Sequence, residues 1–534
     1  MYEKSLLVDF FEVASFPLIL MLILRYLWLT ARLGFFDYAV FLHRSSQIFF
    51  SLLVVSLIFL VVGPSYRVLA DETNLLSIAR SIIQDGRAAN ITEQLIYFGE
   101  DHPLTRVDAY RPILFSSLTA LVGLVIGIGE FTPFIVNFFV GFATLFVFSC
   151  IPWFKNKSSQ ILSIILFSAF PQFQLNVTSG GFDALFLLMI ILLVFHHYRT
   201  LYLKDHNSFE AMLVVAVMTA QTRYEACIFL AMPLFAYLSL RANGFSLNIF
   251  SLKYLLYIIA ASPIFVQKII TTSYANEGDD PHVAFSVKYL FDNLMGSLKF
   301  LFVDGFYFIL PYAGVVFLIF FFVVATYLFF KGRLEIDKKI LFPLAVSVFL
   351  IFLSHLLYYM GDYSKPWISR ISVIHLIYIV PLVFWAIKRI SPNNKLTIFV
   401  FISLFFLGMN KSMYENPGSL LTWAREFNVV RTFLSEFDNR GRTLIVSNRS
   451  GMYVALGYSS ISDLTAQKDQ KILLANLRNG LFDRMVILQV LDLNNDPPLF
   501  DFYPEFSGLR LNDQRRVQID GLTYARFSVL VCCK

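Results

Sequence analysis

The sequence predicts a polytopic α-helical membrane protein that ends in a small α/β domain. Hydrophobic residues make up 57% of the 534 residues and charged residues only 15%, which excludes an ordinary soluble globule. The mean hydropathy is +0.66. Most apolar residues lie in runs long enough to cross a bilayer, whereas the last quarter of the chain has short apolar runs between polar segments. The long runs predict the membrane class, and the change in pattern predicts the separate domain.

The apolar runs predict about twelve transmembrane helices, for which about 20 residues each suffice. They cover residues 11–29, 47–65, 132–154, 159–173, 181–197, 208–222, 224–240, 252–270, 306–330, 340–360, 371–387 and 396–410. The first run contains Glu12 and Arg25 and lacks a small-residue cleavage pattern, so we expect a retained span rather than a removable signal peptide. A further apolar stretch, 112–128, is expected to lie at the interface or to re-enter the membrane.

Basic residues in the short loops set the predicted orientation. Loops on one side are rich in Lys and Arg, as at 331–339, whereas loop 174–180 on the other side contains none. The basic side is the predicted cytoplasmic side of an inner or plasma membrane. We therefore predict a multi-span domain over 1–410, whose first outer loop is 66–111, and an extracytoplasmic α/β domain over 411–534.

The tail has the pattern of a small α/β domain. Residues 443–447 and 484–490 are predicted to form buried strands, and 516–531 a closing pair of strands. Between the first two, 464–479 is predicted to form a helix that Gly480 ends. The tail contains no glycine-rich phosphate loop, so we expect a structural or acceptor-docking role for it.

Two adjacent carboxylates, Asp71 and Glu72, follow the second predicted span. Apolar residues continue after them at helical spacing, which predicts an amphipathic helix that holds both acids beside the membrane. A carboxylate there can deprotonate an acceptor hydroxyl or amine, or bind a cation that faces a phosphate. The alternative is that Asp71 only marks the end of a span.

The same region resembles the first outer loop of the GT-C glycosyltransferase superfamily. Asp71-Glu72 leads into a short helix that ends at Asp85-Gly86, and Tyr110-Arg111-Pro112 then precedes an apolar helix. The pattern is most similar to the branch of protein O-mannosyltransferases and lipid A aminoarabinose transferases, although Asn74 stands where that branch has an aromatic residue and only one proline is present. The resemblance implies a GT-C-like fold and a sugar donor carried on a lipid phosphate.

The resemblance also points to site residues on later outer loops. Asp183, which opens a predicted span, matches an acidic residue of those families, although interaction with the helix N-terminus would also explain it. Arg223 and Arg370 are expected to face the carrier phosphate, since a guanidinium binds phosphate oxygens bidentately. An ion pair with Glu225 is the alternative for Arg223. Lys365 is a third candidate for the phosphate.

A divalent cation is left open by the sequence. Asp71 and Asp183 are its candidate ligands, because carboxylate oxygens suit such ions. The acidic cluster 277–282 includes a histidine but lacks regular ligand spacing, so we expect a solvated loop there.

The predicted function is a glycosyltransferase that takes its sugar from a polyprenyl-phosphate donor at the outer membrane face. Asp71, with Glu72 and Asp183, is the predicted catalytic group, and the acceptor is a glycan, a lipid or a protein. A polysaccharide polymerase or ligase is one alternative, and a lipid or polysaccharide transporter (a flippase) is another. The net charge of +6 is spread over short loops, which argues against a nucleic-acid partner.

Overall fold

A computed structural model describes most of the chain. The described residues are 6–34, 44–67, 69–97, 100–109, 111–154, 156–241, 254, 256–262, 285–304, 312, 314–316, 338–359, 361–390, 394–415, 429–435, 442–492, 498–518 and 523–532. The chain divides into two compact units. We call them the sheet unit, which comprises Met1–Phe16, Tyr66–Pro133 and Pro417–Lys534, and the helical unit, which comprises Pro17–Ser65 and Phe134–Asn416.

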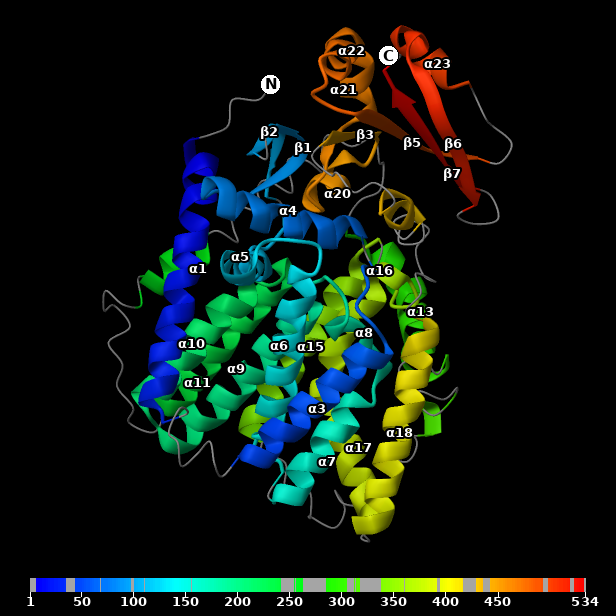
Figure 1. Cartoon of the computed structure of the whole chain (residues 1–534). Helices are drawn as coiled ribbons and strands as arrows, with labels where there is room; N and C mark the ends of the chain where they lie inside the picture. The colour runs from blue at the N-terminus through cyan, green and yellow to red at the C-terminus, as the bar shows by residue number, and fades with distance from the viewer. Residues whose placement is uncertain are drawn as a thin grey trace. The chain divides into compact units, whose positions relative to one another are not determined.

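The helical unit consists of packed apolar helices (Figure 1). Its elements are α3 (Ser45–Val61), α6 (Thr132–Ser149), α7 (Lys157–Ser168), α8 (Pro171–Val177), α9 (Asp183–Leu203), α10 (His206–Ala220), η1 (Tyr224–Leu230), α11 (Ala231–Arg241), η2 (Val287–Tyr289), α13 (Leu290–Phe302), α15 (Lys338–Leu357), α16 (Pro366–Ser369), η3 (Arg370–His375), α17 (Leu376–Ile390) and α18 (Asn394–Glu415). Helix α1 (Leu6–Arg32) contributes residues to both units.

Among the described residues, five helices are long and apolar enough to cross a membrane. They are Val8–Arg32, Thr132–Ser149, Asp183–Tyr202, Tyr224–Arg241 and Lys395–Met413. The predicted span 159–173 falls on α7 and α8, which meet at an angle of 77° and form either a broken span or a re-entrant segment. Pro171, at the start of α8, has no N–H with which to continue α7. The predicted number of about twelve spans is not confirmed, and the predicted spans 252–270 and 306–330 lie largely outside the described residues.

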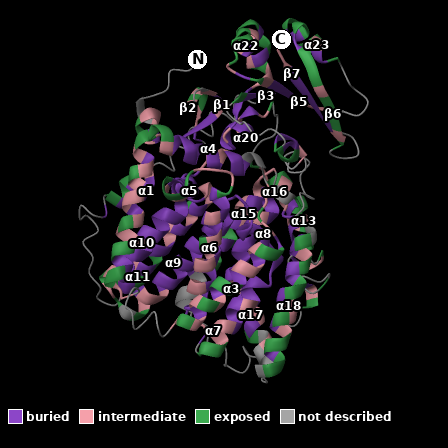
Figure 2. Ribbon diagram, viewed as in Figure 1, coloured by how far each residue is buried: buried purple, intermediate pink, exposed green. Residues whose placement is uncertain are grey.

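Helix α9 forms the core of the helical unit. Its span is 83% buried, against 61% or less for the other four (Figure 2). It packs against α10, α11, α15 and η3. A helix that is apolar on all sides suits either a protein core or a membrane span, and the burial of α9 places it among the other helices. Because α9 begins at Asp183, a carboxylate stands at one end of this buried helix.

The stretch 112–128 contains one short apolar helix, α5 (Leu114–Ile126). Its 13 residues cover about 20 Å, whereas the hydrocarbon core of a bilayer is about 30 Å thick. The interfacial or re-entrant placement of this stretch stays a prediction.

The sheet unit joins the early polar segment to the C-terminal tail. Its elements are α4 (Leu69–Asp85), β1 (Ala89–Tyr97), β2 (Glu100–Asp108), α5, β3 (Thr443–Ser447), α20 (Ser450–Ala455), β4 (Ser459–Ile461), α21 (Asp463–Lys468), α22 (Gln470–Arg478), β5 (Arg484–Asp492), α23 (Leu499–Phe502), η5 (Pro504–Gly508), β6 (Arg510–Gln518) and β7 (Thr523–Val531). In the described part of the chain, seven strands form one sheet in the order β2-β1-β4-β3-β5-β7-β6 (Figure 1).

The strands that the sequence predicts in the tail are present. β3 and β5 pair in parallel from Thr443 with Arg484 to Ser447 with Leu488. All five residues of β3 are buried, as a short continuous apolar run predicts for a central strand. β6 and β7 form the predicted antiparallel pair. The predicted helix is divided into α21 and α22, and Gly480 follows it with φ of +73°, a conformation that favours glycine.

The first predicted outer loop belongs to the same sheet as the tail. Gln94 of β1 pairs with Ser460 of β4, and Leu95 lies in one apolar cluster with Leu444 and Ile487. The structure thus groups residues 66–133 with the tail in one compact unit, whereas the sequence predicts the loop 66–111 as part of the multi-span domain. The pairing depends on contacts between segments far apart in the chain, which no local pattern reveals.

Candidate active site

The two acids of the early segment occupy the first turn of α4. Asp71 and Glu72 are buried, with exposures of 7% and 1%. Asp71 forms an ion pair with Nη2 of Arg111 through Oδ1. Oε2 of Glu72 accepts the backbone N–H of Arg67 at 2.6 Å. Glu72 therefore supports the chain at the start of α4, and Asp71 is held by a side chain.

Three residues predicted for the donor side come together in the helical unit. Asp183, which is 1% exposed, forms an ion pair with Nη1 of Arg223 through Oδ1, and its Oδ2 lies 3.3 Å from Nε of Arg370. The ring of Phe182 lies 5.1 Å and 5.6 Å from the two guanidinium carbons. We call Asp183, Arg223 and Arg370 the arginine cluster. One carboxylate offsets the repulsion between two neighbouring cations, so they can stay close together.

Helix ends position the arginine cluster. Asp183 is the first residue of α9, where a carboxylate also interacts favourably with the helix N-terminus. Arg223 lies between α10 and η1 with extended backbone (φ −151°, ψ 150°), and Arg370 is the first residue of η3. The chain thus brings three helix starts together at this place.

The predicted ion pair of Arg223 is present, whereas Lys365 lies apart from the arginine cluster. The ion pair of Arg223 with Glu225, named as an alternative, is present, with 2.7 Å between Nε and Oε1. It coexists with the contact to Asp183. Lys365 is exposed, and among the described residues it forms no ion pair. The arginine cluster therefore does not include it.

Solved structures with a similar fold include two crystal structures of ArnT, a lipid A aminoarabinose transferase with a GT-C fold, from Cupriavidus metallidurans. The structure bound to undecaprenyl phosphate gives a TM-score of 0.53 at 11% identity, and the apo structure gives 0.55 at 10%. Each similarity covers 90% of this chain and 97% of ArnT.

The chain has a GT-C fold. The resemblance inferred from its first outer loop is confirmed at the level of the fold, and the chain is an integral membrane protein with several apolar helices. No protein-family model and no curated protein sequence matches the chain.

Two further residues in this GT-C fold contact the predicted site residues, although the sequence does not predict them as part of the site. Arg111, which belongs to the Tyr110-Arg111-Pro112 motif, is the ion-pair partner of Asp71. His355 lies in the middle of an apolar run and contacts Glu225 at 3.3 Å. A histidine within a predicted membrane helix is a signal that could have identified it, because polar residues are costly there.

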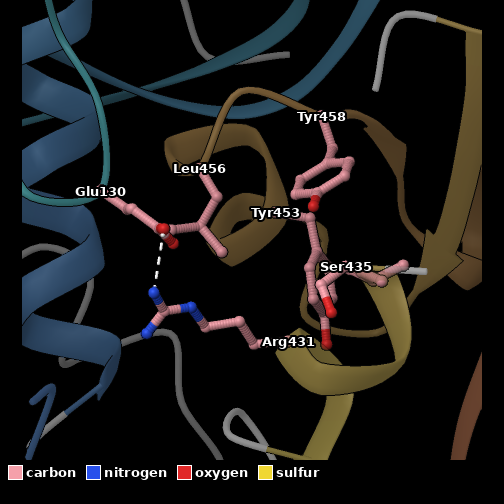
Figure 3. Close-up of a pocket in the computed structure, with 7 residues that line it drawn as sticks. Glu130, Arg431, Ser435, Tyr453, Leu456 and Tyr458 are labelled. Atoms are coloured by element: carbon pink, nitrogen blue, oxygen red, sulfur yellow. Dashed lines mark hydrogen bonds and ion pairs between the residues drawn. The ribbon is translucent and has the colours of Figure 1, made fainter. Parts of the chain in front are cut away.

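The sheet unit of this GT-C fold contains a pocket of about 140 Å³ (Figure 3). Its lining residues are Glu130, Arg431, Leu434, Ser435, Tyr453, Leu456 and Tyr458. Arg431 and Glu130 form an ion pair of 3.0 Å across it, and Tyr458 presents an aromatic ring. Charged groups beside aromatic rings suit a small ligand with hydroxyl groups, since such a ligand has both polar and apolar faces.

Tyr66 connects the surroundings of this pocket with those of the acids of α4. Its hydroxyl donates to the backbone carbonyl of Glu130 at 2.7 Å. Burial and the negative charges of Glu72 and Glu130 raise the pKa of the Tyr66 hydroxyl, so it stays protonated as a donor. Glu72 and the pocket thus influence the same side chain within the sheet unit.

Asp71 and Asp183 are also the predicted ligands of a divalent cation. Among the described residues, no three His, Cys, Asp or Glu side chains are grouped so that they could hold a metal ion. The candidate ligands Asp71 and Asp183 each pair with arginine. The acidic cluster 277–282 lies outside the described residues.

Proposed function

We propose that the chain is a glycosyltransferase that transfers a sugar from a polyprenyl-phosphate donor to an acceptor at the outer face of the membrane. The observation that carries this proposal is the arginine cluster, in which Asp183 bridges Arg223 and Arg370. Paired guanidinium groups bind phosphate oxygens, and a phosphate is the leaving group of such a donor. The GT-C fold and the undecaprenyl phosphate bound to ArnT support the same class of donor.

The donor side of the proposed reaction belongs to the helical unit. Arg223 and Arg370 bind the phosphate of the donor and stabilise the negative charge that grows on it as the bond to the sugar breaks. Asp183 orients the two arginines rather than activating the acceptor, because its two oxygens already contact them.

The acceptor side belongs to the sheet unit. Asp71 is the proposed general base, and Glu72 supports the start of α4 that carries it. The acceptor oxygen or nitrogen attacks the anomeric carbon, its proton passes to the carboxylate of Asp71, and the bonding electron pair stays on the phosphate oxygen. The pocket at Glu130 and Arg431 is the proposed place for part of the acceptor, which is a glycan, a lipid or a protein.

A transfer assay tests this proposal. The purified full chain in lipid nanodiscs is given radiolabelled sugars on synthetic polyprenyl phosphates, together with lipid, glycan and peptide acceptors. We expect transfer by the wild type and its loss in Arg223→Ala. Arg442→Ala is the matched control, because Arg442 forms an exposed ion pair of 2.6 Å with Asp483 in the sheet unit.

Two outcomes would contradict the proposal. If the same chain, reconstituted in sealed vesicles, moves labelled lipid across the bilayer without forming a new glycosidic bond, it is a flippase. Equal transfer by the wild type and by Arg223→Ala would remove the arginine cluster from the reaction.

A further inference from the structure

A series of hydrogen-bonded polar side chains extends from the arginine cluster through the interior of the helical unit. It starts at Glu225, whose Oε1 lies 3.3 Å from Nε2 of His355. Nδ1 of His355 lies 3.4 Å from the hydroxyl of Tyr363. The same hydroxyl lies 3.3 Å from Nε2 of His375, whose Nδ1 is 2.5 Å from the hydroxyl of Tyr378. These contacts form an unbroken series of hydrogen bonds.

When both imidazoles are neutral, the chemistry of the groups gives each hydrogen bond one direction. A carboxylate only accepts, so His355 donates from Nε2 to Glu225. Nδ1 of a neutral His355 then accepts, and Tyr363 donates to it. The Tyr363 oxygen accepts from Nε2 of His375, and Tyr378 donates to Nδ1 of His375. Every link is satisfied when both imidazoles are neutral and carry their proton on Nε2.

We propose that Tyr378, His375, Tyr363 and His355 form a relay that positions Glu225 and, through it, the donor-binding guanidinium of Arg223. We call these four residues the tyrosine–histidine relay. The proposal rests on the proposed function, in which Arg223 binds the donor phosphate, and it adds four positioning residues that do not touch the donor themselves.

The geometry at Arg223 shows what the relay would achieve. Glu225 accepts from Nε at 2.7 Å, and Asp183 pairs with Nη1. Among the described residues, nothing pairs with Nη2 of Arg223, so this nitrogen is available to a ligand. A guanidinium already held at two of its nitrogens loses little conformational entropy when it binds a phosphate.

The fold supports an ordered relay rather than a loose set of contacts. His355 comes from α15, Tyr363 from the segment between α15 and α16, and His375 and Tyr378 from η3 and α17, three residues apart on one helical face. His355, Tyr363 and His375 are buried. Buried polar groups must satisfy one another, so the loss of one member disturbs its neighbours.

Direct binding of undecaprenyl phosphate tests the relay without an acceptor. The dissociation constant is measured for the full chain in nanodiscs, with wild type, Arg223→Ala, Tyr363→Phe and Tyr257→Phe compared. Tyr257→Phe is a matched control, because its buried hydroxyl donates at 2.5 Å to Glu210, the ion-pair partner of Arg25 in the same unit. We expect Arg223→Ala and Tyr363→Phe each to bind about tenfold more weakly, and Tyr257→Phe to bind as the wild type.

The outcomes separate the relay from the proposed function. Weak binding by Arg223→Ala with wild-type binding by Tyr363→Phe would overturn the relay and leave the proposed function intact. Wild-type binding by Arg223→Ala would overturn both. Equal weakening by Tyr363→Phe and Tyr257→Phe would assign the effect to general packing and would also overturn the relay.

A second pair of variants tests the direction of the hydrogen bonds. The amide of His355→Gln supplies one donor for Glu225 and one acceptor for Tyr363, whereas the side chain of His355→Leu supplies neither. We expect His355→Gln to keep binding within about threefold of the wild type and His355→Leu to lose about tenfold. Equal binding by the two variants would overturn the assignment of donors and acceptors.

Discussion

The backbone N–H of Ser462 donates to Oε1 of Glu93 at 2.8 Å, a hydrogen bond between residues 369 positions apart. The hydroxyl of Thr465 also donates to Oε1 at 2.8 Å, and that of Thr105 donates to Oε2 at 2.6 Å. One carboxylate in β1 therefore ties β2 and the start of α21 together. The segment that carries Asp71 and the C-terminal tail are parts of one folded body.

Glu93→Gln should loosen this junction. Burial opposes the charge of Glu93, but hydrogen bonds from Ser462, Thr105 and Thr465 outweigh it and lower the pKa of the carboxyl group. Hydrogen bonds to a charged group contribute about 1.5–3 kcal/mol, and a glutamine retains part of that. We expect a local opening free energy lower by about 1 kcal/mol, measured by hydrogen exchange of peptides covering 459–468 at pH 7.

The pH dependence of this effect has a definite sign. A carboxyl whose folded pKa is depressed contributes stability above its unfolded value of 4.5, and that contribution is lost as the pH falls through the folded pKa. The difference between wild type and Glu93→Gln should therefore vanish in acid. Glu505→Gln, at an exposed ion pair of 3.9 Å, should show no comparable difference at either pH.

Asp71→Asn should slow the chemical step and leave donor binding intact. General-base catalysis contributes about 10² to 10⁴-fold to a rate, so kcat should fall by that range while the dissociation constant of undecaprenyl phosphate stays unchanged. Glu72→Gln is the comparison, because Glu72 accepts a backbone N–H. Glu72→Gln should lower the melting temperature, and it should reduce kcat less than Asp71→Asn does. Single-turnover transfer measures the effect on the chemical step, and thermal unfolding measures the effect on stability. Full activity in Asp71→Asn would exclude Asp71 as the general base.

Arg370→Ala should weaken binding of the donor, and Lys365→Ala should leave donor binding unchanged. Arg370 shares Asp183 with Arg223, whereas the nearby Lys365 is exposed and forms no ion pair among the described residues. The loss of a charge-assisted contact costs about 1.5–3 kcal/mol, so the donor KM should rise by about tenfold or more in Arg370→Ala. A matching rise in Lys365→Ala would bring that lysine into the donor site.

Arg431→Ala should act on the acceptor alone. The ion pair of Arg431 with Glu130 crosses the pocket of the sheet unit, and its loss removes charged donors from the lining (Figure 3). We expect the acceptor KM to rise by about three- to tenfold, with the donor KM unchanged. Arg442→Ala should change neither constant. If Arg431→Ala also leaves both constants unchanged, the acceptor does not use this pocket.

The sequence predicted the features that depend on local pattern. Apolar runs identified α1, α9 and α18 as membrane helices, because burial in lipid requires about 20 apolar residues in succession. The alternation of short apolar runs with turns identified β3, β5 and the β6–β7 hairpin. The resemblance to the GT-C superfamily, rather than local pattern, predicted Arg223 and Asp183 as site residues, and the cost of a charge at the end of an apolar helix agrees with that choice for Asp183.

Only the tertiary structure decided which of these helices and strands pack together in one compact unit. β1 pairs with β4, and Glu93 contacts Ser462. The two partners in each contact lie far apart in the sequence and meet only in the folded protein, so no local sequence pattern predicts the contact. The placement of Arg370 beside Arg223 likewise follows from the contact that each makes with Asp183 at the start of α9. Local pattern reports the environment of each residue, whereas the identity of its partner depends on the path of the whole chain.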